Sequence, residues 1–98
     1  MSNYKAKTLL DAIGHTPLVE LTKIGKDLKA KIYAKLELTN PGGSIKDRIA
    51  KYMIEKAERE GKIKPGDTII ENSSGNTAMG LAIITRQKGY NLKVVVRD

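Results

Sequence analysis

The chain has 98 residues, enough for one small domain, and a formal net charge of +7. A chain of this size buries only about 60–65% of the surface that its unfolded form exposes, so we expect modest stability. The absence of cysteine excludes a disulfide, a thiolate metal site and a thiol nucleophile. The N-terminus shows no apolar signal region and no apolar run is long enough to span a bilayer, so we expect a cytoplasmic protein without a membrane partner.

The basic residues lie along the whole chain and are interleaved with acidic ones, most clearly over residues 51–64. This alternation is typical of a solvated helix face and not of a basic patch for nucleic acid. We therefore expect no nucleic-acid partner. Salt-dependent binding to DNA would support the weaker alternative, a basic nucleic-acid module.

The first half of the sequence predicts a short helical turn and two strands. Residues 8–13 favour the helical turn, which Gly14 breaks. Residues 18–21 indicate a short strand, and residues 31–38 alternate polar with apolar side chains as in a half-buried strand. His15 lies in a turn without a ligand partner nearby in the sequence, so we interpret it as structural and expect no metal site.

The sequence then predicts a helix from about residue 45 to residue 60. It follows a turn rich in proline and glycine, and Ser44 and Asp47 form a variant of the capping box at its start. Gly61 should end it. Apolar side chains recur every fourth residue and define one stripe, made of Ile45, Ile49, Met53 and Ala57.

A strand, a helix and a second strand follow at residues 68–71, 76–88 and 92–96. This order predicts a right-handed βαβ unit with parallel strands, and therefore an α/β fold. The last strand is apolar, as in a strand covered on both faces, so the chain looks like the first part of something larger.

We expect two parts in the chain. Residues 1–44 would form an N-terminal strand segment, and residues 45–98 would form part of a small α/β domain that carries the substrate loop.

Lys46 is the first candidate site residue, in the first turn of the helix that begins near residue 45. The partial positive charge of a helix N-terminus disfavours the ammonium form of a partly buried lysine. A neutral lysine is a nucleophile that can form a Schiff base. The alternative is that Lys46 and Arg48 are ordinary solvent-exposed charges.

The second candidate site is a loop of five small polar residues at the carboxyl end of the 68–71 strand. Its members are Ser73, Ser74, Gly75, Asn76 and Thr77. Backbone N–H groups and hydroxyls at such a helix start can hold a carboxylate or phosphate. The alternative is a turn in which one side chain caps the helix. Together with Lys46, this loop indicates carbonyl-cofactor chemistry on amino acids.

Three ordered motifs resemble one family of enzymes: Ile13–Val19, Asn40–Arg48 and Ser73–Thr77. Their order and spacing resemble the N-terminal third of the cysteine synthase (O-acetylserine sulfhydrylase) and cystathionine β-synthase family. These are fold-type II enzymes that depend on pyridoxal 5′-phosphate. The resemblance covers the whole chain and implies an incomplete part of that fold.

The resemblance also implies roles for the candidate residues. Lys46 resembles the catalytic lysine that binds the cofactor as a Schiff base and later moves the Cα proton. Asn76 resembles the asparagine that hydrogen-bonds the cofactor's 3′-oxygen, and residues 73–77 resemble the loop that binds the substrate carboxylate. The family reaction is β-replacement, in which sulfide replaces the β-substituent of O-acetylserine and yields cysteine, with the cofactor as electron sink.

The sequence departs from the family pattern at several places. His15 stands where the family usually has asparagine, and Ser73 stands where cysteine synthases usually have threonine. The family's loop for the cofactor phosphate and its contact to the pyridine nitrogen have no counterpart in the 98 residues. We therefore expect weak or absent cofactor affinity for this chain alone.

Two functional hypotheses follow, and whether the chain alone is an enzyme stays open between them. In the first, the chain is an N-terminal part or truncated homologue of a cysteine synthase, weakly active or inactive by itself. In the second, it is a non-catalytic protein that pairs with itself or with a full-length synthase. The retained lysine and loop favour the first. The apolar last strand predicts a homo-oligomer or pairing with another chain.

Overall fold

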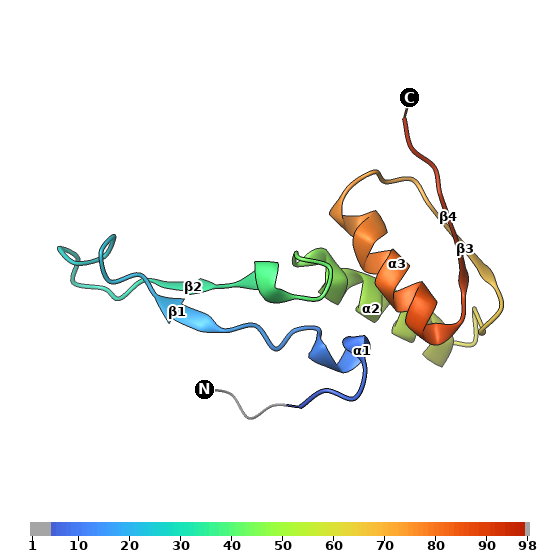
Figure 1. Ribbon diagram of the computed structural model, residues 1–98, viewed down its shortest axis with the longest axis horizontal. Coiled ribbons are helices and arrows are strands. Elements are labelled where there is room, and N and C mark those ends of the chain that lie inside the picture. The colour runs from blue at the N-terminus through green and yellow to red at the C-terminus, as the bar shows by residue number, and fades with distance from the viewer. Residues whose placement is uncertain (1–4, 98) are drawn as a thin grey trace.

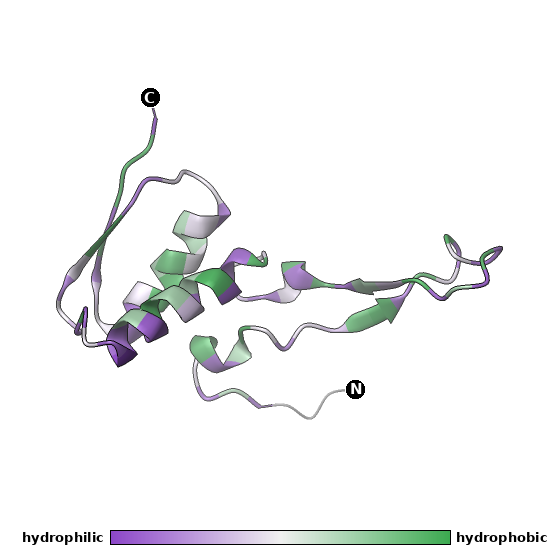
Figure 2. Ribbon diagram, turned by 180° about the vertical axis from the view of Figure 1, so that it is seen from behind, coloured by the Kyte–Doolittle hydropathy of each residue, from purple (hydrophilic) through white to green (hydrophobic). Residues whose placement is uncertain are grey.

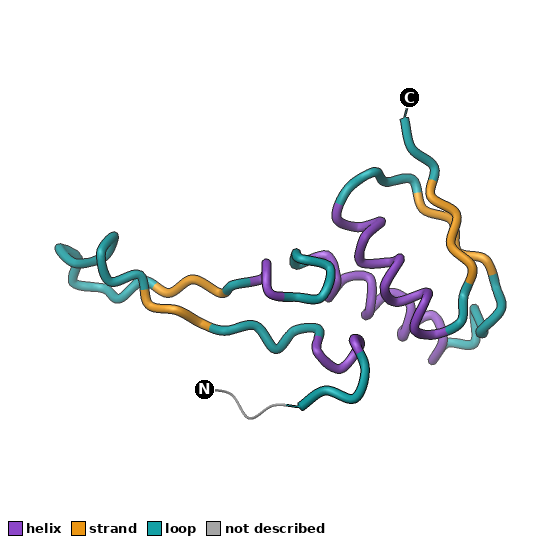
Figure 3. The backbone as a smooth tube through the Cα atoms, viewed as in Figure 1, coloured by secondary structure: helices purple, strands orange, loops and turns teal. Residues whose placement is uncertain are grey.

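The computed structural model describes residues 5–97 and has a mixed α/β architecture, as the sequence predicted (Figure 1, Figure 3). The elements in chain order are α1 (Leu9–Ala12), β1 (Leu18–Glu20), β2 (Tyr33–Lys35), the 3-10 turn η1 (Glu37–Thr39), α2 (Lys46–Arg59), β3 (Thr68–Glu71), α3 (Asn76–Lys88) and β4 (Asn91–Val94). None of the helices in this described part is long and apolar enough to cross a membrane.

The chain is elongated because one hairpin projects from the rest. It measures 53 × 38 × 21 Å with a radius of gyration of 16.7 Å, whereas a compact chain of this length has about 13 Å. The hairpin consists of β1 and β2, which pair antiparallel with Leu18 opposite Lys35. It extends away from the two long helices (Figure 1), and none of residues 17–36 is buried.

The predicted strand at residues 31–38 is shorter than expected. Regular pairing covers only Tyr33–Lys35, because the chain turns into η1 immediately afterwards. The hydroxyl of Thr39 donates to the carbonyl of Leu36 at 2.8 Å and closes this turn. The turn directs Glu37 toward the start of α2, which a continuous strand would not do.

The βαβ unit predicted from the second half is confirmed. β3 and β4 are parallel, with Ile69 opposite Leu92, and α3 connects them. Gly89, at φ +83°, ends α3 where the sequence predicted. Regular β4 stops at Val94, although the amide of Val95 still donates to Glu71 at 2.8 Å.

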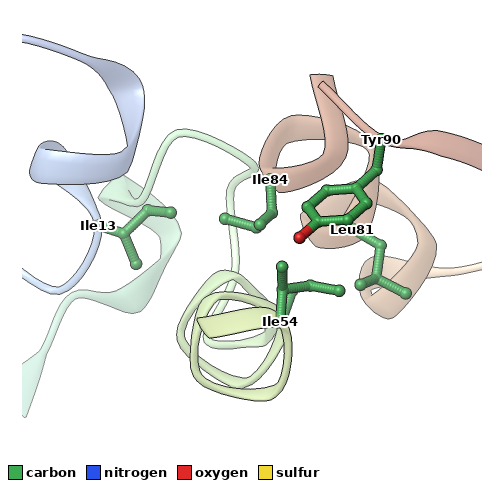
Figure 4. Close-up of a cluster of buried hydrophobic side chains, with 6 residues drawn as sticks. Ile13, Ile54, Leu81, Ile84 and Tyr90 are labelled. Carbon is green, nitrogen blue, oxygen red and sulfur yellow. The ribbon is translucent and has the colours of Figure 1, made fainter. Parts of the chain in front are cut away.

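The core lies mainly between α2 and α3, with contributions from both sides. Its buried side chains are Ile13, Ala50, Ile54, Leu81, Ile84 and Tyr90. Figure 4 shows Ile54 on α2 facing Leu81 and Ile84 on α3. Ile69 and Leu92 of the sheet pack against this cluster from the β3–β4 side, so α3 covers one face of the sheet. The other face, which carries Ile70, is exposed.

The apolar stripe predicted on α2 is not its packed face. Ile45, Ile49 and Met53 remain 41–51% exposed, and the buried residues of the helix are Asp47, Ala50 and Ile54. Successive residues of an α-helix are about 100° apart, so these two sets lie on different sides of it. Figure 2 shows green hydrophobic segments along the hairpin and along both long helices. The spacing of four residues correctly indicated an apolar face on α2, but none of the described residues packs over that face.

The end of α2 has the geometry of a glycine-terminated helix, as predicted. Gly61 has φ +70°, a left-handed conformation that glycine adopts without steric cost. The Lys62 amide donates to Ala57 at 2.9 Å and the Gly61 amide to Glu58 at 3.0 Å. These are the two bonds of a Schellman motif, which satisfies the last carbonyls of the helix.

We predict that Gly80→Ala destabilises the chain although alanine favours helix more than glycine. A Cβ at Gly80 would lie 3.0 Å from the Lys46 carbonyl oxygen and 3.3 Å from Ala50 Cβ, both in the facing helix. Such overpacking costs about 1–3 kcal/mol, against a propensity gain of about 1 kcal/mol. The measurement is urea unfolding, with Met79→Ala at the neighbouring exposed position as control. Higher stability of Gly80→Ala would contradict the close approach of the helices.

Candidate functional site

The structure brings the two predicted site segments to the same end of the helix pair. Lys46 is the first residue of α2, and Gly80, one turn into α3, lies against the Lys46 backbone. At the opposite ends, the Lys88 ammonium contacts the Glu58 carboxylate at 2.8 Å. The two helices therefore run in the same general direction and end together at the lower right of Figure 1. Their positive N-terminal ends consequently share one side of the molecule.

Lys46 is half-buried, so it is not one of the fully exposed lysines of the alternative interpretation. Its backbone amide donates to the Ser44 hydroxyl at 3.1 Å. Within residues 5–97, its Nζ takes part in no hydrogen bond or ion pair, in contrast to the paired ammonium groups of Lys35, Lys51 and Lys88. The Lys46 amine is therefore available to a ligand.

Asp47 differs from the predicted capping box. Its carboxylate is fully buried and turns back to accept the Gly42 amide at 2.5 Å. The Ser44 hydroxyl accepts a hydrogen bond from the Lys46 amide and not from the Asp47 amide. A side chain at Gly42 would overlap the Asp47 carboxylate, which explains glycine at this position. The other carboxylate oxygen, Oδ1, has no hydrogen-bond partner among the described residues.

Arg48 is not an ordinary exposed charge, and this corrects the alternative interpretation. Its guanidinium Nε and Nη2 donate to the two oxygens of Glu37 at 2.5 and 3.0 Å. Nη2 also donates to the Gly14 carbonyl at 3.0 Å and to the Thr16 hydroxyl at 3.1 Å. One side chain therefore joins the start of α2 to two earlier segments of the chain. The bidentate pair is the strong form of an arginine–carboxylate contact.

Asn40 completes this polar network from a buried position. Its amide oxygen accepts the Gly14 N–H at 2.9 Å. Its amide nitrogen donates to the carbonyls of Glu37 and Ser44, both at 3.0 Å, and to Glu37 Oε1 at 3.1 Å. Every polar atom of this buried side chain is satisfied, as buried polar groups require.

Sequence reasoning missed Thr16, Glu37 and Asn40 as parts of the site. The sequence places Asn40 at the start of a family motif without indicating its contacts, and it places Glu37 in the strand expected over residues 31–38. The available signal was the polar residue directly before the Pro-Gly-Gly turn, because such a residue can hydrogen-bond several backbone groups around the turn. No local signal pairs Glu37 with Arg48, because the contact depends on η1.

The loop over residues 73–77 leads directly into α3, and its alternative role as a cap is not observed. The cap position is Gly75, and no side chain bonds to the first-turn amides of α3. The Ser73 hydroxyl accepts only the Gly75 amide, at 3.3 Å. Ser74, Gly75 and Asn76 are exposed, and Thr77 is half-buried. The start of α3 thus presents uncapped N–H groups beside several hydroxyls, an arrangement suited to an anion.

The candidate site is an open surface in this chain. Hollows of about 390 Å³ and 340 Å³ lie elsewhere, the first along residues 20–24 of the hairpin and the second along the last turns of α2 and the residues just after it, from Tyr52 to Lys62. Neither hollow is lined by Lys46 or by residues 73–77. Ser74, Gly75 and Asn76 are exposed and Lys46 is half-buried, so the candidate site lies open to solvent.

The Arg48–Glu37 contact predicts a specific loss of stability in acid. The hydrogen bond from Arg48, and then that from Thr16, lowers the pKa of Glu37 from 4.5 to about 2 despite partial burial. A pKa lowered by folding stabilises the folded state fully above about pH 4.5, and this contribution is lost as the pH falls toward about 2. As the pH is lowered through this window, the midpoint of unfolding should fall less steeply for Glu37→Gln than for the unaltered chain. Glu20→Gln on the exposed hairpin is the control, and equal slopes for Glu37→Gln and the unaltered chain would refute the prediction.

Comparison with known proteins identifies relatives of the whole chain. The family described as "Pyridoxal-phosphate dependent enzyme" matches residues 9–98. A cysteine synthase of Staphylococcus aureus is 57% identical over 90 residues, which are 92% of this chain and 29% of that protein. An N-(2-amino-2-carboxyethyl)-L-glutamate synthase of Ralstonia nicotianae is 53% identical over 93% of this chain and 27% of its own length.

Solved structures show the same fold over nearly the whole chain. A hydrogen sulfide-producing enzyme from Fusobacterium nucleatum overlays with a TM-score of 0.88 at 50% identity, covering 97% of this chain and 31% of its own. An O-acetylserine dependent cystathionine β-synthase from Helicobacter pylori overlays with a TM-score of 0.82 at 40% identity, over 97% and 32% of the two chains. The chain thus spans about three tenths of the length of these relatives. It belongs to the family of pyridoxal-phosphate dependent enzymes.

Proposed function

We propose that this chain supplies the lysine and the carboxylate-binding loop of a cysteine synthase, as its N-terminal part. The reaction would be the replacement of the β-substituent of an activated serine, such as O-acetylserine, by sulfide. One observation carries the proposal: the amine of Lys46, which has no partner within residues 5–97, and the uncapped start of α3 share one end of the helix pair. The cysteine synthases among the relatives support the substrate class.

The residues present fit pyridoxal 5′-phosphate by the chemistry of their donor groups. The amine of Lys46 matches an aldehyde, the amide side chain of Asn76 can donate to a phenolic oxygen, and the uncapped amides of α3 favour an anion. When bound, the cofactor supplies an electron sink for bonds at the substrate Cα. Within the 98 residues we assign no group to its phosphate, so weak or absent affinity of the chain alone remains a prediction.

Each proposed residue has a distinct task. Lys46 Nζ would bind the cofactor carbon and, once released from it, hold and return the Cα proton, because a neutral amine near a reacting carbon acts as a general base. The hydroxyls of Ser73, Ser74 and Thr77 and the uncapped first-turn amides of α3 would orient the substrate carboxylate. Holding the carboxylate fixes the substrate in one orientation, which removes entropy from the reaction barrier before the chemical step.

A non-catalytic role through pairing is the second candidate. It is favoured by the apolar surface that remains exposed on Ile45, Ile49 and Met53 and at Val94–Val96. Exposed apolar surface favours association with another chain. The division into parts at residues 1–44 and 45–98 and the cytoplasmic location also remain predictions.

The proposed cofactor site predicts a specific change in visible absorbance when pyridoxal 5′-phosphate is titrated into the chain. At the high cofactor concentrations that weak affinity requires, the change should approach saturation and should be lost in Lys46→Ala, because that lysine is the proposed attachment point. Lys64→Ala, at an exposed lysine outside the site, should behave as the unaltered chain. An equal response in all three proteins would mean attachment to surface lysines and would reject the assignment.

The exposed apolar surface predicts that the chain forms a dimer or a larger species. Light scattering over a range of concentrations would measure the mass. The double variant Ile49→Lys and Met53→Lys should shift the chain toward the monomer, because both changes place charge on the exposed stripe. A monodisperse monomer of the unaltered chain at all concentrations would count against association.

A further inference from the structure

We propose that Arg48, held by Glu37, is a positioning residue that fixes the start of α2 and thereby the direction of Lys46. This inference rests on the proposed function of Lys46. Arg48 follows Lys46 by two residues, about 200° around the helix, so the two side chains leave the helix on nearly opposite sides. Arg48 can therefore anchor the first turn without occupying the space into which Lys46 extends.

The anchor is strong because it fixes Arg48 from several directions. The Arg48 guanidinium donates two hydrogen bonds to Glu37, one to the Gly14 carbonyl and one to the Thr16 hydroxyl. Glu37 is itself held by the Thr16 hydroxyl at 2.6 Å and by Asn40. Opposing charges with several shared hydrogen bonds hold one geometry better than an isolated surface pair.

A second anchor acts on the residue between Lys46 and Arg48. The buried Asp47 carboxylate accepts the Gly42 amide and so ties the first turn to the glycine turn that precedes it. Lys46 has no such side-chain partner within residues 5–97. Its direction therefore depends on the backbone that its two neighbours hold in place.

The far end of α2 carries a comparable network, which provides a matched control. Glu58 accepts hydrogen bonds from Lys88 at 2.8 Å and from the Tyr90 hydroxyl at 2.7 Å. This network joins α2 to α3 and to Tyr90, which directly precedes β4, whereas Arg48 joins α2 to the segments before it. Both networks stabilise the helix, but only that of Arg48 borders the first turn.

The first test is amide hydrogen exchange of the chain without cofactor, resolved by residue. The variants are Arg48→Met, Arg48→Lys and the double variant Arg48→Met with Glu37→Gln, which leaves no unpaired carboxylate and guards against unfolding. Glu58→Gln is the control. Exchange at residues 46–50 should accelerate about tenfold or more in Arg48→Met and in the double variant, as expected from losing charged hydrogen bonds.

The pattern along the helix decides the outcome. Exchange around Ile54 should stay within about twofold in the Arg48 variants, because unfolding free energy varies locally within one fold. Arg48→Lys should give an intermediate effect, since lysine keeps the charge but lacks the planar fork. Unchanged exchange at residues 46–50, or uniform acceleration along α2, would overturn the proposal. The same local acceleration in Glu58→Gln would overturn it as well.

The second test reads Lys46 directly. Each protein is treated with pyridoxal 5′-phosphate and then with borohydride, and peptide mapping gives the modification of Lys46 relative to Lys64. The ratio should fall about tenfold or more in Arg48→Met, since small misplacements of a reacting group have effects of this size, and should hold in Glu58→Gln. An unchanged ratio despite faster local exchange would overturn the positioning role. If Lys46 and Lys64 were modified equally in the unaltered chain, the proposed function of Lys46 would be rejected. The hydrogen-exchange pattern alone would then test whether Arg48 anchors the first turn of α2.

Discussion

The close contact between α2 and α3 at Gly80 places the candidate site. Without a side chain at Gly80, the second turn of α3 reaches the backbone of Lys46, and Ala50 and Leu81 pack in the same layer. This contact fixes where the loop before α3 lies relative to the lysine, although the two segments are about thirty residues apart in the sequence. A larger residue at this position would separate the helix starts, and with them the Lys46 amine and the uncapped amides of α3.

Local signals were sufficient for the elements of the second half. The glycines at positions 61 and 89 mark the helix ends by a conformation that few other residues adopt. The parallel pairing of β3 and β4 followed from the helix between them. The site segments themselves were visible because each combines a helix start with reactive or polar side chains. The sequence did not show that the two site segments lie close together, because their proximity depends on a tertiary contact through Gly80 that no periodicity reveals.

Long-range polar contacts explain the remaining differences. The strand predicted to residue 38 stops at Lys35 because η1 turns Glu37 toward Arg48. The stripe of Ile45, Ile49 and Met53 is apolar and correctly spaced, yet the structure packs the Asp47–Ala50–Ile54 side instead. Hydrophobic periodicity identifies a face but does not say which partner covers it. In relatives more than three times as long, further chain is present that could lie against such a face.

The hairpin of β1 and β2 is attached to the rest of the chain by hydrogen bonds and not by a hydrophobic core. Thr16 and Glu37 lie just outside the two ends of the hairpin and hydrogen-bond to each other, and none of residues 17–36 is buried. Polar attachments and apolar cores respond differently to heat, salt and denaturant. We therefore expect the hairpin and the βαβ body to unfold as two cooperative units of unequal strength, with the hairpin detaching first. Unfolding of this chain would then not be a two-state process, and a single melting temperature would not describe it.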